Sequence, residues 1–310
     1  MARIINLGSV NIDFVYAVPH ILREGETLTA TERSIHVGGK GLNQSVAMSR
    51  AGLPVEHAGI VGADGLRLVD MLNDEAVSTD LVRVLAEKAS GHTVIQVTPE
   101  GRNAILYYPG TNALVTEDFI AEVIDAAEPD DLLVLQNEVA GTAAALRLAH
   151  EAGIRVLYNP SPFDPTVPAE LIGEVYALIV NENEGAALLG VEPDSLSDDE
   201  LFDELCRRFP IPVLILTLGD RGSRAHLPGT SPIVVPAREV VACDTTGAGD
   251  TYLGFVTRAL FPRHASKAVF HDALSRAMGE ATIASSIAVT RHGAAMSIPT
   301  LNEVLQAESI

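Results

Sequence analysis

The sequence lacks tryptophan, has few aromatic residues, and contains two cysteines, Cys206 and Cys243. Two cysteines make no disulfide framework, and no histidine stands near them at zinc-ligand spacing. No uncharged apolar run reaches the ~18 residues that a membrane-spanning helix needs. Asn6 and Asn11 fall where a secretory signal would require an apolar core. These absences predict a globular, cytoplasmic protein.

Basic residues are also scarce, because 21 lysines and arginines face 41 acidic residues and the formal charge is −20. A surface this acidic repels phosphate backbones and anionic lipid, so we expect no nucleic-acid or membrane partner. The chain has 310 residues, of which 47% are hydrophobic, and that content supports a packed core and excludes disorder.

Short aliphatic runs alternate with helical patterns through the middle of the chain. The predicted strands are 3–8, 132–136, 154–158, 177–181 and 213–217, and the predicted helices between them are 142–152 and 198–208. Continuous apolar runs of this kind are typical of a parallel sheet that helices cover on both faces. Such sheets bind ligands at the carboxyl ends of their strands.

Two segments, at about 13–37 and 91–112, interrupt this order. Their polar and apolar residues alternate as in exposed antiparallel strands, so we expect a small sheet that projects from the main body. The sheet would serve as a lid, or it would be a pair of edge hairpins without function. With no repeat, linker or low-complexity segment, residues 1–310 are predicted to form one domain with these two excursions.

Two glycine-rich blocks carry most of the chemical information. The first is Gly38-Gly-Lys-Gly-Leu-Asn-Gln-Ser45, and the second is Asp244-Thr-Thr-Gly-Ala-Gly-Asp250; each precedes a helical pattern. A Gly-Ala-Gly turn that opens a helix leaves backbone N–H groups unpaired at the positive end of the helix dipole, which is a site for an anion.

Asp250 follows that turn directly. A carboxylate repels a bound anion, so its position beside the site needs a chemical reason. One reason is proton removal from a nucleophile, so the block suggests phosphoryl transfer with Asp250 as the base. The other is that Asp250 simply favours the helix N-terminus. Neither block is a Walker A loop, since Gly41 follows Lys40, and Tyr252 stands where a dinucleotide fingerprint would place its last glycine.

These blocks and several shorter fragments, in this order and over nearly the whole chain, resemble the ribokinase-like (PfkB) carbohydrate kinases. No single fragment identifies a family, but their occurrence together in the order of this family is specific to it. The shorter fragments are Gly8-Ser-Val-Asn-Ile-Asp13, Gly59-Ile-Val-Gly-Ala-Asp-Gly65, Pro109-Gly-Thr-Asn112, Asn159-Pro-Ser-Pro162, Asn181-Glu-Asn-Glu184 and Thr217-Leu-Gly-Asp-Arg-Gly222.

The resemblance implies a three-layer α/β sandwich with a central, mainly parallel sheet and a small β-sheet lid. It implies transfer of the γ-phosphoryl group of ATP to a sugar primary hydroxyl, with Asp250 as base and the amides of Gly247, Ala248 and Gly249 as the anion hole. The positions that match the family's sugar site are Asn11, Asp13, Gly39, Lys40, Asn43, Glu138 and Asp250. Those that match its nucleotide site are Asn181, Glu184, Thr217, Gly219 and Gly222.

The resemblance also implies two metal ions. Glu184 would organise Mg²⁺ through water, which suits an ion that binds few carboxylates directly. A K⁺ ion beside the anion hole would use one carboxylate and several backbone carbonyls, at the positions Asp244, Thr246, Ala288, Arg291, Gly293 and Ser297. The alternative for these positions is a helix end followed by a plain turn.

The polar residues also have simpler interpretations. Asn11 and Asp13 could serve turn chemistry after a strand, Glu138 could start a surface helix, and Lys40 could be a solvated charge. Together they suit a polyol, because a site built to pair vicinal hydroxyls rejects analogues that lack one.

The identity of the sugar stays open between several candidates. Ribose comes first; fructose or another ketose, a 2-keto-3-deoxy sugar acid and a nucleoside are alternatives on the same fold. Arg23, Arg33 and Arg102, in or near the expected lid, leave a sugar phosphate open. A catalytically silent sugar- or nucleotide-binding regulator is a further alternative.

The resemblance also implies a homodimer that pairs through its lids. The family pattern is broken at a few positions that we place on helix faces near the pocket: Leu42, Ser45, Tyr252 and Leu253.

Overall fold

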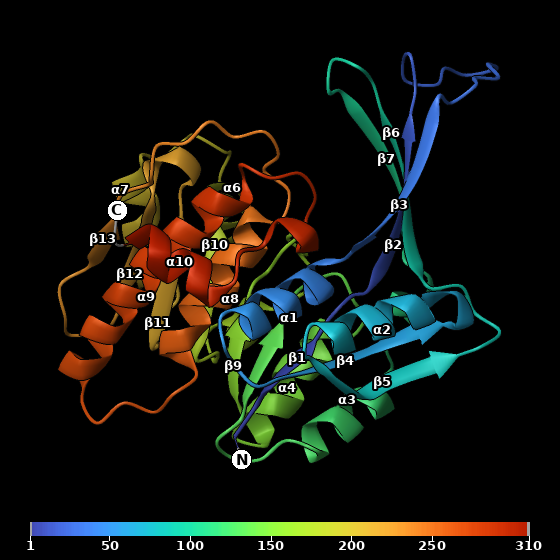
Figure 1. Ribbon diagram of the computed structural model, residues 1–310. Coiled ribbons are helices and arrows are strands. Elements are labelled where there is room, and N and C mark those ends of the chain that lie inside the picture. The colour runs from blue at the N-terminus through green and yellow to red at the C-terminus, as the bar shows by residue number, and fades with distance from the viewer. Residues whose placement is uncertain (1, 309–310) are drawn as a thin grey trace.

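The computed structural model describes residues 2–308, and its centre is a nine-stranded sheet (Figure 1). Its strands are β1 (Ile4–Leu7), β4 (Val55–Gly62), β5 (Ser78–Leu85), β8 (Leu132–Leu135), β9 (Arg155–Tyr158), β10 (Ala177–Asn181), β11 (Val213–Thr217), β12 (Ser223–His226) and β13 (Ile233–Val235). They lie in the order β13-β12-β11-β10-β9-β8-β1-β4-β5. All neighbours pair in parallel except β12, which is antiparallel to both β11 and β13.

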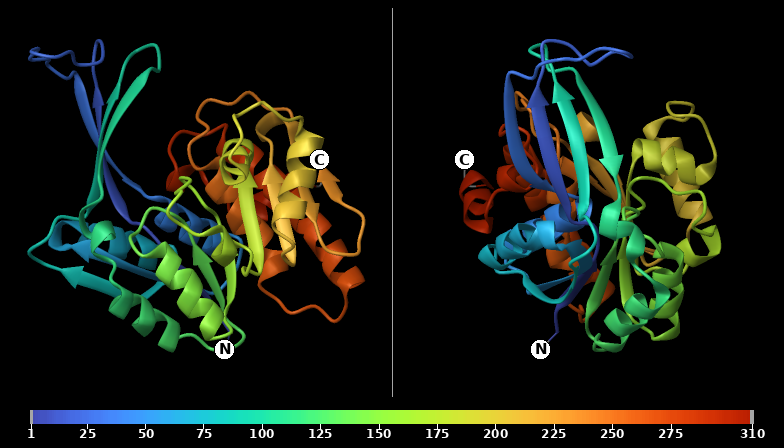
Figure 2. Two further views of the ribbon diagram at one scale, coloured as in Figure 1. Left: turned by 180° about the vertical axis from the view of Figure 1, so that it is seen from behind. Right: turned by 90° about the vertical axis from the view of Figure 1, so that its right-hand side faces the viewer.

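Helices cover both faces of this sheet, as the right-hand view of Figure 2 shows. One layer contains α1 (Lys40–Arg50), α2 (Leu66–Asp74), α8 (Ala248–Leu260), α9 (Lys267–Ala288) and α10 (Leu301–Glu308). The other contains α3 (Glu117–Asp125), α4 (Thr142–Glu151), α5 (Ala169–Ile172), α6 (Glu182–Leu189) and α7 (Asp198–Arg208). Each layer has its own apolar core against the sheet, because strand residues alternate between the two cores. This three-layer arrangement confirms the predicted fold class.

A second sheet of four strands projects from the body (Figure 1). Its strands are β2 (Asn11–Ala17), β3 (Glu32–Gly38), β6 (Gly91–Val97) and β7 (Asn103–Tyr108), in the order β3-β2-β6-β7. The two predicted excursions therefore meet in one sheet. The outer pairs are antiparallel, but β2 and β6 run parallel, because the chain returns to the body between them. We call these four strands the lid sheet.

The expected elements are present with small shifts, and others were not expected. The helix after the second glycine block begins at Ala248, within the block itself. β4, β5, β12 and β13 were not predicted; β4 carries Glu56 and His57 and is nonetheless buried throughout. Among residues 2–308, no helix combines the length and apolar character needed to cross a membrane.

The positions that depart from the family pattern lie in the core rather than on the predicted pocket. Leu42 and Leu253 are fully buried between α1 and α8. The hydroxyl of Tyr252 donates to Ser223 Oγ at 2.8 Å, and burial raises the pKa of Tyr252. Their identity therefore follows from the packing between these helices and the sheet.

Candidate functional site

The polar residues predicted for the site converge at the carboxyl edge of the large sheet. β1 lies inside the sheet, with β4 on one side and β8 on the other. After β1 the chain adds strands first on one side and later on the opposite side, so the strand order reverses at β1. In open α/β sheets such a reversal opens a crevice at the carboxyl ends of the strands. The segments after β1, β8, β10 and β11 all reach this edge and supply the residues described below.

Asp250 lies in the first turn of α8 and is only 6% exposed. Both of its carboxylate oxygens accept a hydrogen bond from an amide side chain of α1. Asn43 Nδ2 donates to Oδ2 at 3.0 Å, and Gln44 Nε2 donates to Oδ1 at 2.9 Å. The two glycine blocks, about two hundred positions apart, therefore meet at this carboxylate.

The turn before Asp250 has the geometry of an anion site. Gly247 adopts φ +76°, a left-handed conformation that favours glycine, and it is the N-cap of α8. The N–H groups that follow lie at the positive end of the helix; that of Ala248 donates to the Thr245 carbonyl at 3.3 Å, and those of Gly249 and Asp250 have no partner within the helix. A Cβ built on Gly249 would meet nothing within 4 Å, so space is open beside these amides. The turn can therefore accommodate a transferring phosphoryl group.

Asn11 and Asp13 lie at the base of the lid sheet on β2. Asn112 Nδ2 donates to Asn11 Oδ1 at 2.7 Å, and Thr93 Oγ1 donates to Asp13 Oδ1 at 2.6 Å. A Cβ on Gly38 would lie 2.1 Å from Asp13 Oδ2, so only glycine admits this close approach. Burial raises the pKa of Asp13 despite the bond from Thr93. These contacts fix both side chains rather than leave them to a surface turn.

Glu138 ties the first glycine block to the end of β1. Its Oε2 atom accepts from Ser9 Oγ at 2.5 Å and from the backbone N–H of Lys40 at 2.9 Å. Gly39, at φ +95°, leaves no room for a Cβ against the Ser9 carbonyl. The alternative interpretation of Glu138 as the start of a surface helix therefore does not hold: its carboxylate is an acceptor at the edge of the site.

Lys40 lies among carboxylates and is not a solvated charge. Burial alone would lower its pKa, but the charges of Asp250, Glu138 and Glu184 raise it above the ordinary value. The ammonium group therefore interacts with the predicted base and with a carboxylate of the predicted nucleotide side, and it can neutralise an anionic ligand.

Asn181 and Glu184 form the capping box of α6. Asn181 Oδ1 accepts from the Glu184 N–H at 2.8 Å, and Glu184 Oε2 accepts from the Asn181 N–H at 3.0 Å. Glu184 is 8% exposed, and burial raises its pKa. Its charge also interacts with Lys40 and Asp250, so this carboxylate faces the same edge as the predicted base.

The other predicted nucleotide residues lie at the end of β11. Thr217 Oγ1 donates to the Val180 carbonyl at 3.3 Å, which joins the ends of β11 and β10. Gly219 has φ +57° and open space around its Cβ position. Gly222 has φ +95°, and a Cβ at this position would lie 2.2 Å from the Val235 carbonyl oxygen. Both features require glycine in the turn between β11 and β12.

The loops predicted to hold a monovalent cation are held together through Asp244. Its carboxylate accepts from the N–H of Thr246 at 3.0 Å and from the N–H of Gly293 at 2.9 Å. These bonds outweigh burial and lower the pKa of Asp244. Ser297 Oγ donates to the Ala294 carbonyl, and the Ala288 carbonyl accepts from the Arg291 N–H.

A network of side-chain amides behind Asp250, three of them buried and one half-buried, was missed by sequence reasoning. We call it the amide network and define it by Gln44, Gln136, Asn6 and Asn159. Gln136 Nε2 donates to Gln44 Oε1 at 2.7 Å and to Asn6 Oδ1 at 2.8 Å, and Gln44 Nε2 donates to Asn159 Oδ1 at 3.1 Å. The signal available was that Gln136 and Asn159 directly follow the buried strands β8 and β9.

The network continues through Ser45 to a buried histidine. Asn6 Nδ2 donates to Ser45 Oγ at 2.8 Å, and Ser45 Oγ lies 2.9 Å from His57 Nδ1. His57 is completely buried, and this lowers its pKa to about 4. The imidazole is therefore neutral in the folded protein at pH 7.

This histidine predicts an acid-sensitive fold. Since unfolded histidine has a pKa of about 6.5, the unfolded chain binds a proton below that pH, and folded His57 resists it down to about pH 4. Stability is therefore lost as pH falls through this window, by about 2 kcal/mol at pH 5. Urea unfolding of native protein and His57→Gln at about pH 7.5 and pH 5 measures this. Equal acid losses in both proteins would contradict it.

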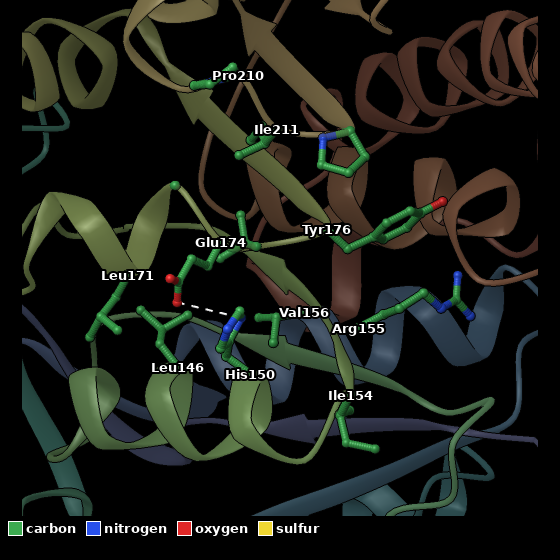
Figure 3. Close-up of a pocket in the computed structure, with 14 residues that line it drawn as sticks. Leu146, His150, Ile154, Arg155, Val156, Leu171, Glu174, Tyr176, Pro210 and Ile211 are labelled. Atoms are coloured by element: carbon green, nitrogen blue, oxygen red, sulfur yellow. Dashed lines mark ion pairs between the residues drawn. The ribbon is translucent and has the colours of Figure 1, made fainter.

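A second hollow, of about 370 Å³, lies at the opposite edge of the sheet (Figure 3). It is lined by the amino ends of β9 and β10 and by the segment before β11, with apolar side chains including Leu146, Val156 and Ile211. His150 and Glu174 form an ion pair of 3.4 Å across it. None of the predicted site residues lines this hollow, so it is separate from the site built around Asp250.

Comparisons with known proteins agree with this geometry. The model of the pfkB family of carbohydrate kinases matches residues 1–301. A ribokinase of Haemophilus influenzae is 32% identical over 308 residues, which cover 97% of this chain and 96% of that one. The solved ribokinase of Cryptococcus neoformans in complex with ADP has a TM-score of 0.81 and 30% identity, with 99% and 100% of the chains covered. Arabidopsis thaliana ribokinase complexed with ribose and ATP has a TM-score of 0.87 and 25% identity, with both chains fully covered.

Proposed function

This chain belongs to the pfkB family of carbohydrate kinases, and we propose that it transfers the γ-phosphoryl group of ATP to the primary hydroxyl of D-ribose. The observation that carries the proposal is the position of Asp250. Its carboxylate lies beside the open N-terminal amides of α8 and is bonded to Asn43, beside the polar residues suited to a polyol. The relatives named as ribokinases and the structure that contains ribose and ATP support ribose as the acceptor.

Proton transfer and charge stabilisation are the two tasks of the chain's residues in this reaction. The Asp250 carboxylate takes the proton of the primary hydroxyl as the sugar oxygen forms its bond to the γ-phosphorus, and the bond from that phosphorus to the ADP oxygen breaks. The amides of Gly247, Ala248 and Gly249 stabilise the charge on the transferring oxygens. Lys40, whose ammonium group lies among the carboxylates, offsets charge that moves between the two substrates.

Ribose would be held by the fixed polar groups of both sheets. Asn11 and Asp13 offer acceptors from the lid sheet, Asn43 and Glu138 offer them from the body, and Gly39 and Lys40 form the turn between. The Oδ1 atom of Asn43 is buried with no hydrogen-bond partner among the described residues, which suits an acceptor that a sugar hydroxyl fills.

The nucleotide side fits a hydrated divalent ion. Residues 2–308 contain no cluster of three acidic, histidine or cysteine side chains that could hold a metal alone. Glu184, aided by Asn181, would act on Mg²⁺ through water while phosphate oxygens of ATP supply direct ligands, as that ion prefers. Mg²⁺ would neutralise phosphate charge; Thr217, Gly219 and Gly222 would form the adjoining wall of the nucleotide site.

The loops joined by Asp244 fit a monovalent cation that accepts oxygen ligands. Asp244 and the backbone carbonyls of Thr246, Ala288, Arg291, Gly293 and Ser297 are the oxygens we assign to K⁺. Its charge would stabilise an anion that the neighbouring amides of α8 hold. The Asp244–Gly293 hydrogen bond supports the assignment, since it brings the two carbonyl-bearing loops together.

We also propose a homodimer formed through the lid sheets. Strand β7 is a free edge and exposes Ile105, Leu106 and Tyr108, an apolar surface that a second lid sheet would cover. Light scattering should give twice the 32.8 kDa of one chain, and Leu106→Glu should halve the mass. Val234→Glu, on an exposed edge far from the lid, should leave it unchanged. A native monomer at micromolar concentration contradicts the proposal.

A reducing, cytoplasmic location completes the proposal, since Cys206 and Cys243 are both free and Cys243 is exposed. ADP release with ATP and Mg²⁺, with and without K⁺, tests the function across ribose, fructose, 2-keto-3-deoxygluconate and adenosine. We expect turnover with ribose, increased by K⁺. Measurable ATP binding with no turnover on any acceptor would favour the silent regulator, which the intact Asp250 and its glycines oppose.

A further inference from the structure

We infer that Gln44 is a positioning residue for the base: it holds the Asp250 carboxylate in the orientation that phosphoryl transfer requires. The inference rests on the proposed function and adds to it a residue with no assigned role. Gln44 is fully buried on α1, next to Asn43, and it donates to Asp250 Oδ1 at 2.9 Å.

The orientation of the Gln44 amide is fixed by three partners. Its two N–H groups donate to Asp250 Oδ1 at 2.9 Å and to Asn159 Oδ1 at 3.1 Å, and its carbonyl accepts from Gln136 Nε2 at 2.7 Å. The reverse orientation would set the Gln44 carbonyl against two oxygens and its NH₂ against the NH₂ of Gln136. The donor that faces Asp250 is therefore determined by the rest of the amide network.

The network itself is anchored to the strands. Gln136 follows β8 and also donates to Asn6 Oδ1 on β1, and Asn159 follows β9 and donates through Nδ2 to the Ile179 carbonyl on β10. Gln44 thus connects the catalytic carboxylate to four adjacent strands, β1, β8, β9 and β10. Loops move, but strand ends in the centre of a sheet do not, so Asp250 takes its position from the most rigid part of the fold.

The arrangement divides the tasks of the two amides beside Asp250. Each carboxylate oxygen can accept two hydrogen bonds. Gln44 occupies one acceptor position on Oδ1 and Asn43 one on Oδ2, which leaves a position on each oxygen for the sugar hydroxyl. Asn43 also has a buried Oδ1 with no partner among residues 2–308 and is assigned to the sugar, whereas every polar atom of Gln44 is used within the protein. Gln44 therefore acts on the base and not on the substrate.

The test compares Gln44→Met and Gln44→Asn with Ser45→Ala. Methionine keeps the length of the side chain without its donor, and asparagine keeps the amide but is one methylene too short. Ser45→Ala removes an equally buried hydrogen-bonding group of the neighbouring residue, which contacts Asn6 and not Asp250. Thermal unfolding measures the stability of each variant, calorimetry measures ribose binding, and steady-state kinetics give kcat and KM.

We expect kcat of both Gln44 variants to fall about 10- to 100-fold, because small misplacement of a catalytic group has effects of this size. Ribose affinity and KM should stay within about twofold of native, since no ground-state contact is lost. Ser45→Ala should lose stability while it retains native kcat.

Equal kcat losses in Gln44→Met and Ser45→Ala would mean that Gln44 is merely structural and would overturn the inference. A raised ribose KM with unchanged kcat would assign Gln44 to the sugar and would overturn it as well. Failure of the proposed function is distinct from both, because native protein would then show no ribose-dependent turnover at all.

Discussion

Replacement of Asp250 by asparagine should abolish ribose-dependent ADP release while the protein stays folded. General-base catalysis contributes about 10²- to 10⁴-fold, and asparagine keeps the size of aspartate but cannot accept the hydroxyl proton. ATP and ribose should still bind, because the other polar groups and the α8 amides remain. Steady-state turnover and calorimetric binding of both substrates measure the two effects separately.

The matched control is Asp74→Asn, which removes an exposed carboxylate at the end of α2. This variant should equal native protein in kcat and in thermal stability. If Asp250→Asn were as active as the control, the carboxylate would not be the base and the mechanism would be wrong. If Asp250→Asn lost turnover only because it failed to fold, thermal unfolding would show that the folded state is missing.

Asp13→Asn should raise the KM for ribose by about 10- to 100-fold. A hydrogen bond to a charged group contributes roughly 1.5–3 kcal/mol, and Asp13 is held by Thr93 in one orientation for such a bond. The KM for ATP should not change, since Asp13 lies on the lid sheet and the residues proposed to bind the nucleotide lie at the ends of β10 and β11.

Deoxy sugars make this prediction sharper. A native site that pairs each hydroxyl should discriminate strongly against a ribose that lacks one of them. Asp13→Asn should no longer discriminate against at least one monodeoxyribose, because the carboxylate that pairs with the hydroxyl missing from that sugar has also been removed. Undiminished discrimination against every monodeoxyribose would exclude Asp13 from hydroxyl recognition.

Local pattern was enough to predict the parts of the fold that depend on local sequence. Buried parallel strands such as 177–181 and 213–217 are short aliphatic runs, and their bounds agree with β10 and β11. The lid sheet was visible as alternation, but the parallel pairing of β2 with β6 was not. Pairing between segments about eighty positions apart depends on the path through the body, which no local pattern encodes.

The same limit explains which site residues were missed. Asp250 and Asn43 stand in glycine blocks with recognisable chemistry. Gln44 has its role only because α1 packs against α8, and Gln136 and Asn159 have theirs only because β8 and β9 end at the same level. A polar side chain directly after a buried strand is the available signal, and it indicates an edge, not a partner.

One motif recurs in this chain with different consequences. Asn181 and Glu184 form a capping box on α6, and Ser197 and Glu200 form another on α7. Glu200 is exposed, and its hydrogen bonds to Ser197 lower its pKa. Burial instead raises the pKa of Glu184, which interacts with Lys40 and Asp250. Sequence spacing alone cannot separate a helix cap from a functional carboxylate; burial and charged neighbours can.

Identification of the product is the most direct test of the central claim. Native protein should be incubated with ATP, Mg²⁺, K⁺ and D-ribose, and the products resolved by phosphorus NMR and mass spectrometry. We predict one molecule of ribose 5-phosphate for each ADP, with the phosphoryl group on the primary hydroxyl. ADP and inorganic phosphate in equal amounts, with no phosphorylated sugar, would contradict phosphoryl transfer to ribose.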